Sequence, residues 1–222
     1  IAGEWETPDL CALLRVFIAN RNALEDVIYG HWWGQLAHRL RHWLNRNTRS
    51  NSRKNIHAHY DLGNAFYSLW LDETMNYSSA WFDGNPMLPM AQAQDAKVRR
   101  ALRMVNLTPG HNQRLLEIGC GWGALAEMGT REWGVAFTGV TLSEQQLAHA
   151  QKRLTDQGLG AQAQFRLQDY RDISDAPFDA ICSIEMIEAV GHEYHDTYFK
   201  KCGELLKPHG QMLLQAITIA DQ

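Results

Sequence analysis

The chain has 222 residues, 45% of them hydrophobic, and its formal net charge is −4. This length and apolar content suffice for one full hydrophobic core with a smaller unit attached. The slightly acidic balance gives no reason to expect nucleic acid as a partner, and no apolar run approaches the roughly 20 residues that would span a bilayer.

The cysteines and the ends of the chain bear on where the protein works. The four cysteines are widely separated and show no paired spacing: Cys11, Cys120, Cys182 and Cys202. With no signal peptide in view, we expect reduced thiols and a cytoplasmic protein. The chain starts without Met and stops just after a predicted strand, so we also expect it to be truncated at the C-terminus.

The N-terminal part, residues 1–56, is predicted to be a small helical region that ends in a basic linker. Apolar residues recur at helical spacing over Leu10–Ala19 and over Trp32–Leu44, and the second segment is rich in Trp and His. The stretch Arg39–Lys54 contains basic residues and no acidic one. Two interpretations stay open: this segment lies on an anionic lipid surface, or it is a solvated helix face followed by a polar linker.

Residues 57–222 are predicted to form an α/β domain. The predicted elements are a helix at 92–105, a strand at 114–118, a helix at 124–132, a strand at 135–140, a helix at 143–155, strands at 162–167 and 178–184, a helix at 194–206 and a strand at 211–217. This alternation, with continuous apolar strands, indicates a parallel, doubly wound, Rossmann-like sheet. Because ligands of such sheets bind beyond the carboxyl ends of the strands, five segments should share one surface: 119–123, 141–146, 168–171, 185–191 and 215–218.

The most informative motif is the glycine turn after the first predicted strand. Gly119, Gly121 and Gly123 alternate there, and such a turn lets the backbone approach a ligand while the following helix presents free N–H groups. Inside the strand, Glu117 would be costly to bury without a cationic or hydrogen-bonding partner. Because dinucleotide enzymes use similar turns, the neighbouring residues decide the interpretation.

The second strand argues against a dinucleotide. Dinucleotide enzymes more often carry an acidic residue about 20 positions after the glycines, where it binds the ribose hydroxyls. Here the strand at 135–140 is followed by Thr141, Leu142 and Ser143. The arrangement Glu-x-Gly-x-Gly-x-Gly instead resembles the first motif of class I S-adenosylmethionine (SAM) methyltransferases, in which the strand end and the glycine loop hold the amino-acid part of SAM.

A wider resemblance runs from about residue 1 to the end of the chain. It is carried by six segments: Asn55–Asn64, Met75–Ala80, Leu116–Gly123, Gly139–Ser143, Gln168–Asp172 and Glu185–Glu193. Together they are similar to cyclopropane fatty acid synthase. Many methyltransferases share the glycine motif, whereas His-Tyr-Asp-Leu-Gly-Asn at 59–64 and Glu-Ala-Val-Gly at 188–191 are far more specific.

The resemblance implies transfer of the SAM methyl group to the cis double bond of an unsaturated fatty acyl chain of a phospholipid, forming a cyclopropane ring. An isolated alkene is a poor nucleophile, so the site must align it with the sulfonium methyl group and exclude water. The resemblance also implies a bound bicarbonate that removes a methyl proton. It further implies peripheral association with the inner face of the membrane, with a homodimer as a candidate assembly.

Four positions of the implied catalytic site can be located in this chain. The resemblance places the glutamate that holds bicarbonate at Glu188 and the backbone carbonyl at Ile217. It places the family's cysteine at Ser79 and its histidine at Gln215, so the chain departs from the family pattern twice in one site. Neutral hydrogen-bonding groups can still hold bicarbonate, but the titration of a histidine near neutral pH is lost.

The SAM contacts implied by the resemblance involve more positions. They are Tyr77 and Ser78 for the methionine part, Glu117, Gly119, Gly121 and Gly123 for the strand end and loop, Thr141, Leu142 and Gln146 for the ribose or adenosine, and Asp169 and Tyr170 for the adenine. Structural alternatives stay open for three residues. Gln146 can complete a capping box with Ser143, Tyr170 can be ordinary core, and Glu188 can cap a helix.

Two histidine pairs were considered as metal ligands. His57 and His59 precede Asp61, yet no second cluster completes a zinc site. His192 and His195 are one residue short of the His-Glu-x-x-His spacing. We therefore predict no metal, and we expect the His-Tyr-Asp segment to close over SAM and the acyl chain.

Three functions stay open. The first is a cyclopropane-forming lipid methyltransferase. The second is a relative that makes a methyl or methylene branch on the acyl chain or methylates a small molecule, which Ser79 and Gln215 suggest because weaker base placement lets the cation react otherwise. The third is a catalytically silent lipid- or SAM-binding protein, against which the glycine motif and Glu188 argue.

Overall fold

The computed structural model describes residues 6–21, 63–175 and 177–219. The chain divides into two compact units, Ile1–Arg46 and Asn47–Gln222. In the first unit, α1 (Leu10–Ala19) has the bounds predicted from its apolar spacing, and Asp9 caps it by accepting a hydrogen bond from the Ala12 N–H at 2.9 Å. The predicted helix at 32–44, the basic segment and the predicted boundary at residue 56 lie outside the described residues.

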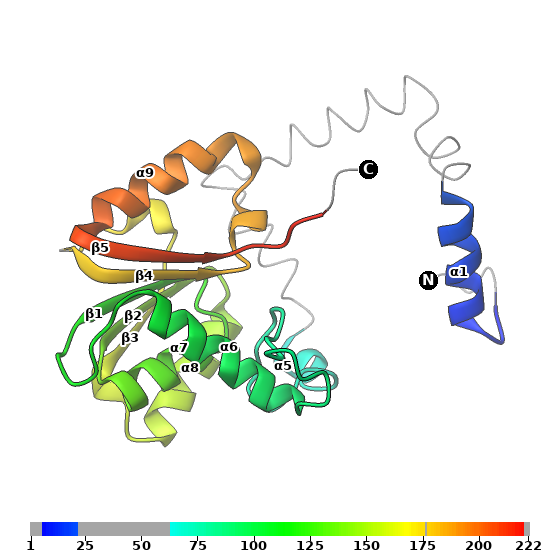
Figure 1. Ribbon diagram of the computed structural model, residues 1–222, viewed down its shortest axis with the longest axis horizontal. Coiled ribbons are helices and arrows are strands. Elements are labelled where there is room, and N and C mark those ends of the chain that lie inside the picture. Colours follow the sequence, from blue (N-terminus) through cyan, green and yellow to red (C-terminus); the bar gives the residue numbers. More distant parts are fainter. Residues whose placement is uncertain (1–5, 22–62, 176, 220–222) are drawn as a thin grey trace. The chain divides into compact units, whose positions relative to one another are not determined.

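The second unit is built on a five-stranded parallel sheet of order β3-β2-β1-β4-β5 (Figure 1). The strands are β1 (Arg114–Ile118), β2 (Ala136–Thr141), β3 (Ala163–Leu167), β4 (Phe178–Ile184) and β5 (Leu206–Gln215). The predicted doubly wound, Rossmann-like fold is confirmed. Because β4 lies on the opposite side of β1 from β2 and β3, the strand order reverses between β1 and β4, where ligands of such sheets bind.

The last strand begins earlier than the sequence predicts. β5 starts at Leu206 rather than at residue 211. A register shift separates the pair Phe178–Leu206 from the pair Ala180–Gln211, and His209 between them takes a positive φ of 69°. The irregular residues form a bulge, so the regular strand pattern in the sequence starts only after it.

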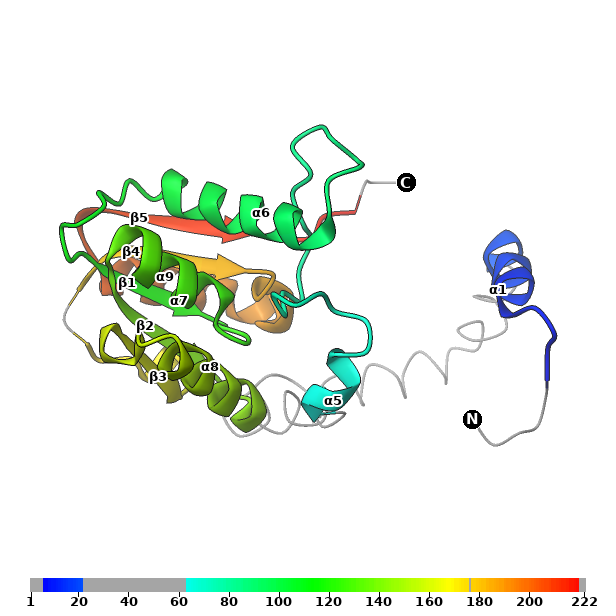
Figure 2. The same ribbon diagram turned by 90° about the horizontal axis from the view of Figure 1, so that it is seen from below.

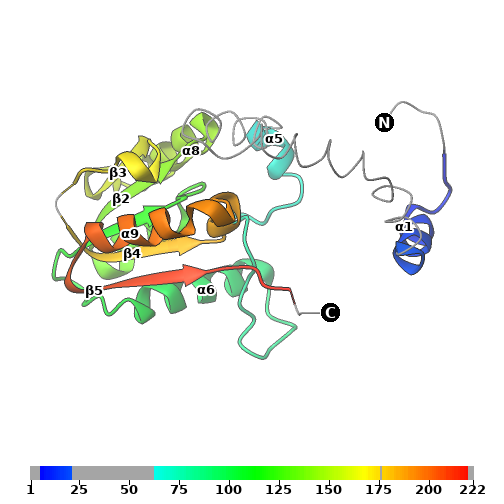
Figure 3. The same ribbon diagram turned by 90° about the horizontal axis from the view of Figure 1, so that it is seen from above.

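Helices cover both faces of the sheet (Figures 2 and 3). One face packs against the first helices of the unit, which are α6 (Met90–Met104), α7 (Ala124–Met128) with its π-helical continuation η1 (Gly129–Trp133), and α8 (Glu144–Asp156). The other face packs against α9 (His195–Leu205). The remaining described elements are α5 (Gly63–Tyr67) and the 3-10 turns η2 (Gly160–Gln162), η3 (Tyr170–Asp172), η4 (Ile187–Ala189) and η5 (His192–Tyr194).

The alternation of side chains along β1 decides what faces α6. Leu115 belongs to the hydrophobic core under α6, α7 and α8, whereas Leu116 belongs to the core under α9. Since every second residue of a strand shares a face, Glu117 points to the same side as Leu115. The sheet therefore directs a carboxylate toward α6 at the carboxyl end of its central strand.

Two global predictions concern thiols and membrane spans. All four cysteines are free thiols, and Cys11 is exposed while Cys120, Cys182 and Cys202 are buried. In the parts of the chain that the structure describes, no helix combines the length and the apolar character needed to cross a membrane.

Candidate active site

A cavity of about 920 Å³ lies at the carboxyl ends of the central strands. All five segments that the sheet topology predicted to share one surface contribute to its lining. Its remaining wall comes from the segment before α6 and from α6 itself, with Trp70, Tyr77 and Gln94 among the lining residues. The cavity thus occupies the place where the strand order reverses between β1 and β4.

Most of the predicted site residues line this cavity. They are Tyr77, Ser78, Ser79, Glu117, Gly119, Gly121, Thr141, Leu142, Gln146, Tyr170, Glu188 and Ile217. Three predicted residues do not line it, namely Gly123, Asp169 and Gln215. Residues that the sequence analysis did not single out also line it, among them Gln94, Gln168 and Glu185.

The three glycine positions after β1 differ in what a side chain would contact there. A Cβ on Gly119 would lie 2.8 Å from Cγ of Met186, and a Cβ on Gly123 would lie 3.0 Å from Cβ of Ala150 in α8. Only around Gly121, whose φ is +49°, is there no heavy atom within 4 Å. Gly119 and Gly123 thus make room for neighbouring parts of the protein, and Gly119 also lines the cavity. That all three glycines let a ligand approach stays a prediction.

Glu117 is buried at the floor of the cavity and is 4% exposed. Its Oε2 has no hydrogen-bond donor among the described residues. Of the two kinds of partner expected for this carboxylate, a cation or a hydrogen-bond donor, the structure therefore shows no donor for Oε2. The nearby charge is that of Lys97 in α6, which acts on Glu117 through space. Burial raises the pKa of Glu117 to about 8, although Lys97 opposes this shift.

Lys97 is a buried cation that the sequence analysis missed. It is 4% exposed, and its Nζ donates hydrogen bonds to Oγ of Ser78 at 2.5 Å and to Oδ1 of Asn76 at 3.3 Å. Burial lowers the pKa of Lys97 to about 8, while Glu185 and Glu117 counteract this shift. The burial of Lys97 could have been predicted from its place on α6. It lies four positions after Ala93 and four before Ala101, so it shares their buried helix face.

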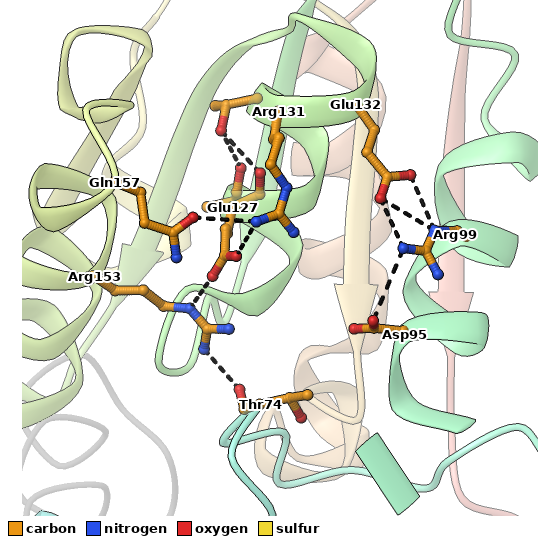
Figure 4. A network of polar contacts seen from close by, with 10 residues as sticks. Thr74, Asp95, Arg99, Glu127, Arg131, Glu132, Arg153 and Gln157 are labelled. Atoms are coloured by element: carbon orange, nitrogen blue, oxygen red, sulfur yellow. Dashed lines mark hydrogen bonds and ion pairs between the residues drawn. The ribbon is translucent and has the colours of Figure 1, made fainter. Parts of the chain in front are cut away.

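The segment that carries Tyr77, Ser78 and Ser79 is held by hydrogen bonds from two helices. Nε2 of Gln94 in α6 donates to the Ser78 carbonyl at 2.9 Å. Figure 4 shows the second anchor, in which Nη1 of Arg153 in α8 donates to the Thr74 carbonyl at 2.7 Å. The same arginine pairs through Nε with Glu127 of α7 at 2.5 Å. This network fixes the segment against the helices that pack on the sheet.

Aromatic side chains form the wall of the cavity above the glycine turn. The Tyr67 ring contacts the rings of Trp70, Tyr77 and Trp122, and Trp70 also contacts Tyr77, with centroid distances between 5.1 and 5.8 Å. The Trp122 indole N–H donates to Oδ1 of Asn64 at 2.7 Å, which attaches α5 to this wall. The wall is therefore apolar and fixed in orientation.

The turn after β2 uses Gln146 in a different way from a simple capping box. Ser143 caps α8 by accepting a hydrogen bond from the Gln146 N–H at 3.3 Å. The Gln146 side chain does not reach back to the Ser143 N–H, because the Thr141 hydroxyl accepts that bond at 3.1 Å and donates to Oε1 of Gln146 at 2.8 Å. Thr141 thereby fixes the amide of Gln146 at the cavity wall.

The loop after β3 places Tyr170, but not Asp169, at the cavity. Asp169 pairs with Arg171 through two hydrogen bonds of 2.6 and 2.8 Å, and it accepts a further one from the Arg171 backbone. Tyr170 is 7% exposed and packs against Tyr198 in the core under α9. It is therefore both a core residue and a lining residue, which joins the two interpretations of its sequence position.

Two glutamates stand at the end of the cavity formed by β4 and β5. Glu188 is exposed, and its Oε1 accepts a hydrogen bond from the Ile217 N–H at 2.5 Å. Glu185, which the sequence analysis did not single out, accepts hydrogen bonds at Oε1 from the Ser79 N–H at 2.8 Å and from Nε2 of Gln215 at 2.9 Å. Gln215 thus lies behind Glu185 rather than in the lining.

The described residues contain no group of three or more side chains arranged to bind a metal ion. The rings of His192 and His195 lie near each other, with centroids 5.2 Å apart. The other histidine pair named in the sequence analysis, His57 and His59, lies outside the described residues.

Comparison with known proteins defines the class of this fold. A solved coclaurine N-methyltransferase bound to S-adenosylhomocysteine (SAH) aligns with 91% of this chain and 62% of its own, with a TM-score of 0.60 at 17% identity. Solved mycolic acid cyclopropane synthases align at 36% identity over 73% of this chain and 55% of theirs. The TM-score is 0.67 for CmaA1 complexed with SAH and CTAB, and 0.68 for MmaA2 from Mycobacterium tuberculosis. The domain therefore has the fold of SAM-dependent methyltransferases.

The family itself is shown by sequence. The profile of the family described as mycolic acid cyclopropane synthetase matches residues 47–222. This chain belongs to that family. Tuberculostearic acid methyltransferase UfaA1 of Mycobacterium tuberculosis is 35% identical over 99% of this chain, and cyclopropane-fatty-acyl-phospholipid synthase of Escherichia coli K12 is 37% identical over 97% of it. The alignments cover 52% and 53% of those two proteins, so this chain spans about half their length.

Proposed function

We propose that this protein uses SAM to convert the cis double bond of an unsaturated phospholipid acyl chain into a cyclopropane ring. The observation that carries the proposal is a pair of buried acceptors without donors. Oε2 of Glu117 and Oε1 of Gln94 both lack hydrogen-bond partners among the described residues, and both residues line the cavity. Buried acceptors of this kind require donors, which the ammonium group of an amino-acid ligand supplies.

The residues around this pair fit the rest of SAM. Gly121 leaves open space next to the acceptors, and Tyr77 and Ser78 face the same region. On the β2 side, the fixed Gln146 amide offers a polar contact for a ribose, and Leu142 and Tyr170 offer apolar surface for a base. The neighbours complexed with SAH support this assignment. We propose no adenine contact for the Asp169 side chain, since Arg171 engages its carboxylate.

The apolar part of the cavity suits a lipid chain. SAM supplies an electrophilic methyl group, and this chain's residues have to exclude water and orient the alkene. Trp70, Met90 and Ile217 line the cavity and are at least half exposed, so apolar surface continues from its interior to its rim. We propose that this rim receives an acyl chain from the inner face of a membrane, with the protein associated peripherally.

The residues to which the resemblance assigned bicarbonate suggest a second candidate function. The family resemblance assigned bicarbonate to Ser79, Glu188, Gln215 and Ile217, and two of these differ from the family pattern. The relative named tuberculostearic acid methyltransferase is about as similar to this chain as the cyclopropane synthase is. Formation of a methyl or methylene branch is therefore the alternative, since both products come from the same methylated cation.

The test uses the full protein, methyl-labelled SAM and vesicles of monounsaturated phospholipid. Proton NMR and mass spectrometry of the released fatty acids distinguish the products. Cyclopropyl protons on labelled chains are the expected result, whereas label in a branch would favour the alternative. SAH binding measured by calorimetry, together with no labelled lipid, would contradict both activities and favour a silent SAM-binding protein.

A further inference from the structure

We propose that Glu185 is the base that removes the methyl proton in this reaction, so that the protein needs no bicarbonate. The inference rests on the function proposed above and adds to it the identity of the proton acceptor. It begins from three facts: Glu185 lines the cavity, it directly follows strand β4, and it is hydrogen-bonded to two of the positions to which the resemblance assigned bicarbonate.

The first step is the hydrogen bonding of the carboxylate. A bicarbonate held at this site would need donors at the cysteine and histidine positions of the family, which are Ser79 and Gln215 here. In this structure the Ser79 N–H and the Gln215 amide both donate to Oε1 of Glu185, at 2.8 and 2.9 Å. The side chain of Glu185 thus already uses one donor from each of these two positions.

The second step concerns the other oxygen of the same group. Among the hydrogen bonds of the described residues, none reaches Oε2 of Glu185. Because a carboxylate oxygen without donors keeps its lone pairs available, Oε2 can accept a proton from a substrate in the cavity.

The third step is the backbone conformation. Glu185 has a φ of +48°, which is uncommon for a residue with a side chain. Its N–H donates to the Gln215 carbonyl at 2.8 Å, so the main chain of β5 holds this conformation and the side chain of the same residue holds the carboxylate. Such unfavourable conformations persist where neighbouring structure fixes them, and they are concentrated at active sites.

The proton transfer balances without a further reactant. When the alkene attacks the SAM methyl group, its π electrons form the new C–C bond, the S–CH3 bond breaks, and a cation remains on the adjacent carbon. Oε2 of Glu185 then takes one proton of the new methyl group, and the electron pair of that C–H bond closes the ring. Glu185 becomes a neutral acid and returns its proton to solvent before the next turnover.

The experiment measures labelled cyclopropane lipid from the full protein in buffer freed of carbon dioxide, with and without added bicarbonate. We expect the wild-type rate to change by less than about twofold on adding bicarbonate. The variant Glu185→Gln should be at least about 100-fold slower, the range typical of losing a general base, while its SAH affinity stays the same. The matched control Glu204→Gln, at an exposed glutamate of α9, should retain the full rate.

A second variant tests the carboxylate site directly. Glu185→Gly removes the side chain and suits the positive φ, and it frees the donors of Ser79 and Gln215. Added bicarbonate or formate should raise its rate by about tenfold or more, because a small carboxylate can take the vacated bonds and act as the base. No rescue would contradict the claim that these donors define a carboxylate site.

The outcomes separate this inference from the proposed function. Labelled lipid whose formation by the wild-type protein requires bicarbonate would overturn the role of Glu185 and leave the proposed function standing. An active Glu185→Gln variant would do the same. No labelled lipid from the wild-type protein under any condition would overturn the proposed function, and the inference with it.

Discussion

The two ends of the cavity differ in whether the protein itself supplies hydrogen-bond donors to their polar groups. At the β1 end, Glu117 and Lys97 are each 4% exposed, and two buried acceptors have no donor among the described residues. At the β4–β5 end, Oε1 of Glu185 and Oε1 of Glu188 accept hydrogen bonds from the protein, and Ile217 beside them is 60% exposed. The first end lacks donors that a cationic ligand would supply, whereas the second has donors from the protein itself. This contrast is the reason that we propose ligand recognition at the first end and proton transfer at the second.

The largest effect should come from removing the carboxylate at the β1 end. Glu117→Gln removes the group that we propose pairs with the ligand's ammonium group, so we expect SAH affinity to fall by about 100-fold, or roughly 3 kcal/mol. Isothermal titration calorimetry measures this change. Glu204→Gln serves as the control, and unchanged affinity of Glu117→Gln would show that the ammonium group binds elsewhere.

The next effect concerns the hydrogen-bonded network of Glu127, Arg153 and Thr74, which anchors the segment leading to Ser79. Arg153→Ala removes one of the two arginine partners of Glu127 and the anchor of the Thr74 carbonyl, and we expect a loss of about 2 kcal/mol in unfolding free energy. Lys152→Ala is its neighbour in sequence and breaks only the exposed pair with Asp156, so it should cost less than about 0.5 kcal/mol. Urea denaturation compares the two, and equal losses would contradict the anchoring role.

The pH dependence of stability should sharpen the same contrast. The folded-state pKa of Glu117 is raised to about 8 from an ordinary value of 4.5, so between these pH values the unfolded state releases a proton that the folded state keeps. The unfolding free energy of the ligand-free protein therefore falls as the pH rises from about 4.5 to about 8. Glu117→Gln lacks the titration, and we expect it to gain roughly 3 kcal/mol relative to wild type between pH 5 and pH 8. Parallel stability curves for the two proteins would refute this.

The smallest effect separates two glycines of one turn. Gly121→Ala and Gly123→Ala both place a side chain at positive φ, which costs about 1 kcal/mol each. Only the second variant also pushes a Cβ against Ala150, so we expect it to be less stable than Gly121→Ala by about 1 kcal/mol. Gly121→Ala, in turn, should be the one that weakens SAH binding. Thermal denaturation with and without SAH tests both expectations.

The sequence predicts the sheet well because its strands are short, continuous apolar runs separated by glycines and helices. Periodicity and the carboxyl-end rule are sufficient to bring five distant loops to one cavity. The start of β5 is missed because a bulge interrupts the pattern before residue 211. Boundaries depend on such local irregularities, whereas the order of elements does not.

The candidate site is predicted less completely, for two physical reasons. Lys97 lies on a helix whose loop neighbours in space, Asn76 and Ser78, are far from it in sequence, and no short motif encodes that contact. Glu185 lies in a segment that the resemblance covers, but its importance depends on an amide from β5 and a backbone N–H from the segment before α6. Only the folded chain brings these three together.

Helix α8 gives the cavity a mechanical property. The first turn of α8 carries Gln146 at the cavity wall, and its last turn carries Arg153, which holds the Thr74 carbonyl and with it the segment leading to Ser79. A helix of 13 residues is about 20 Å long, and it is stiff over that length. Because one stiff helix carries both contacts, a change in its tilt at Gln146 would also move Thr74 and the part of the cavity wall that follows it.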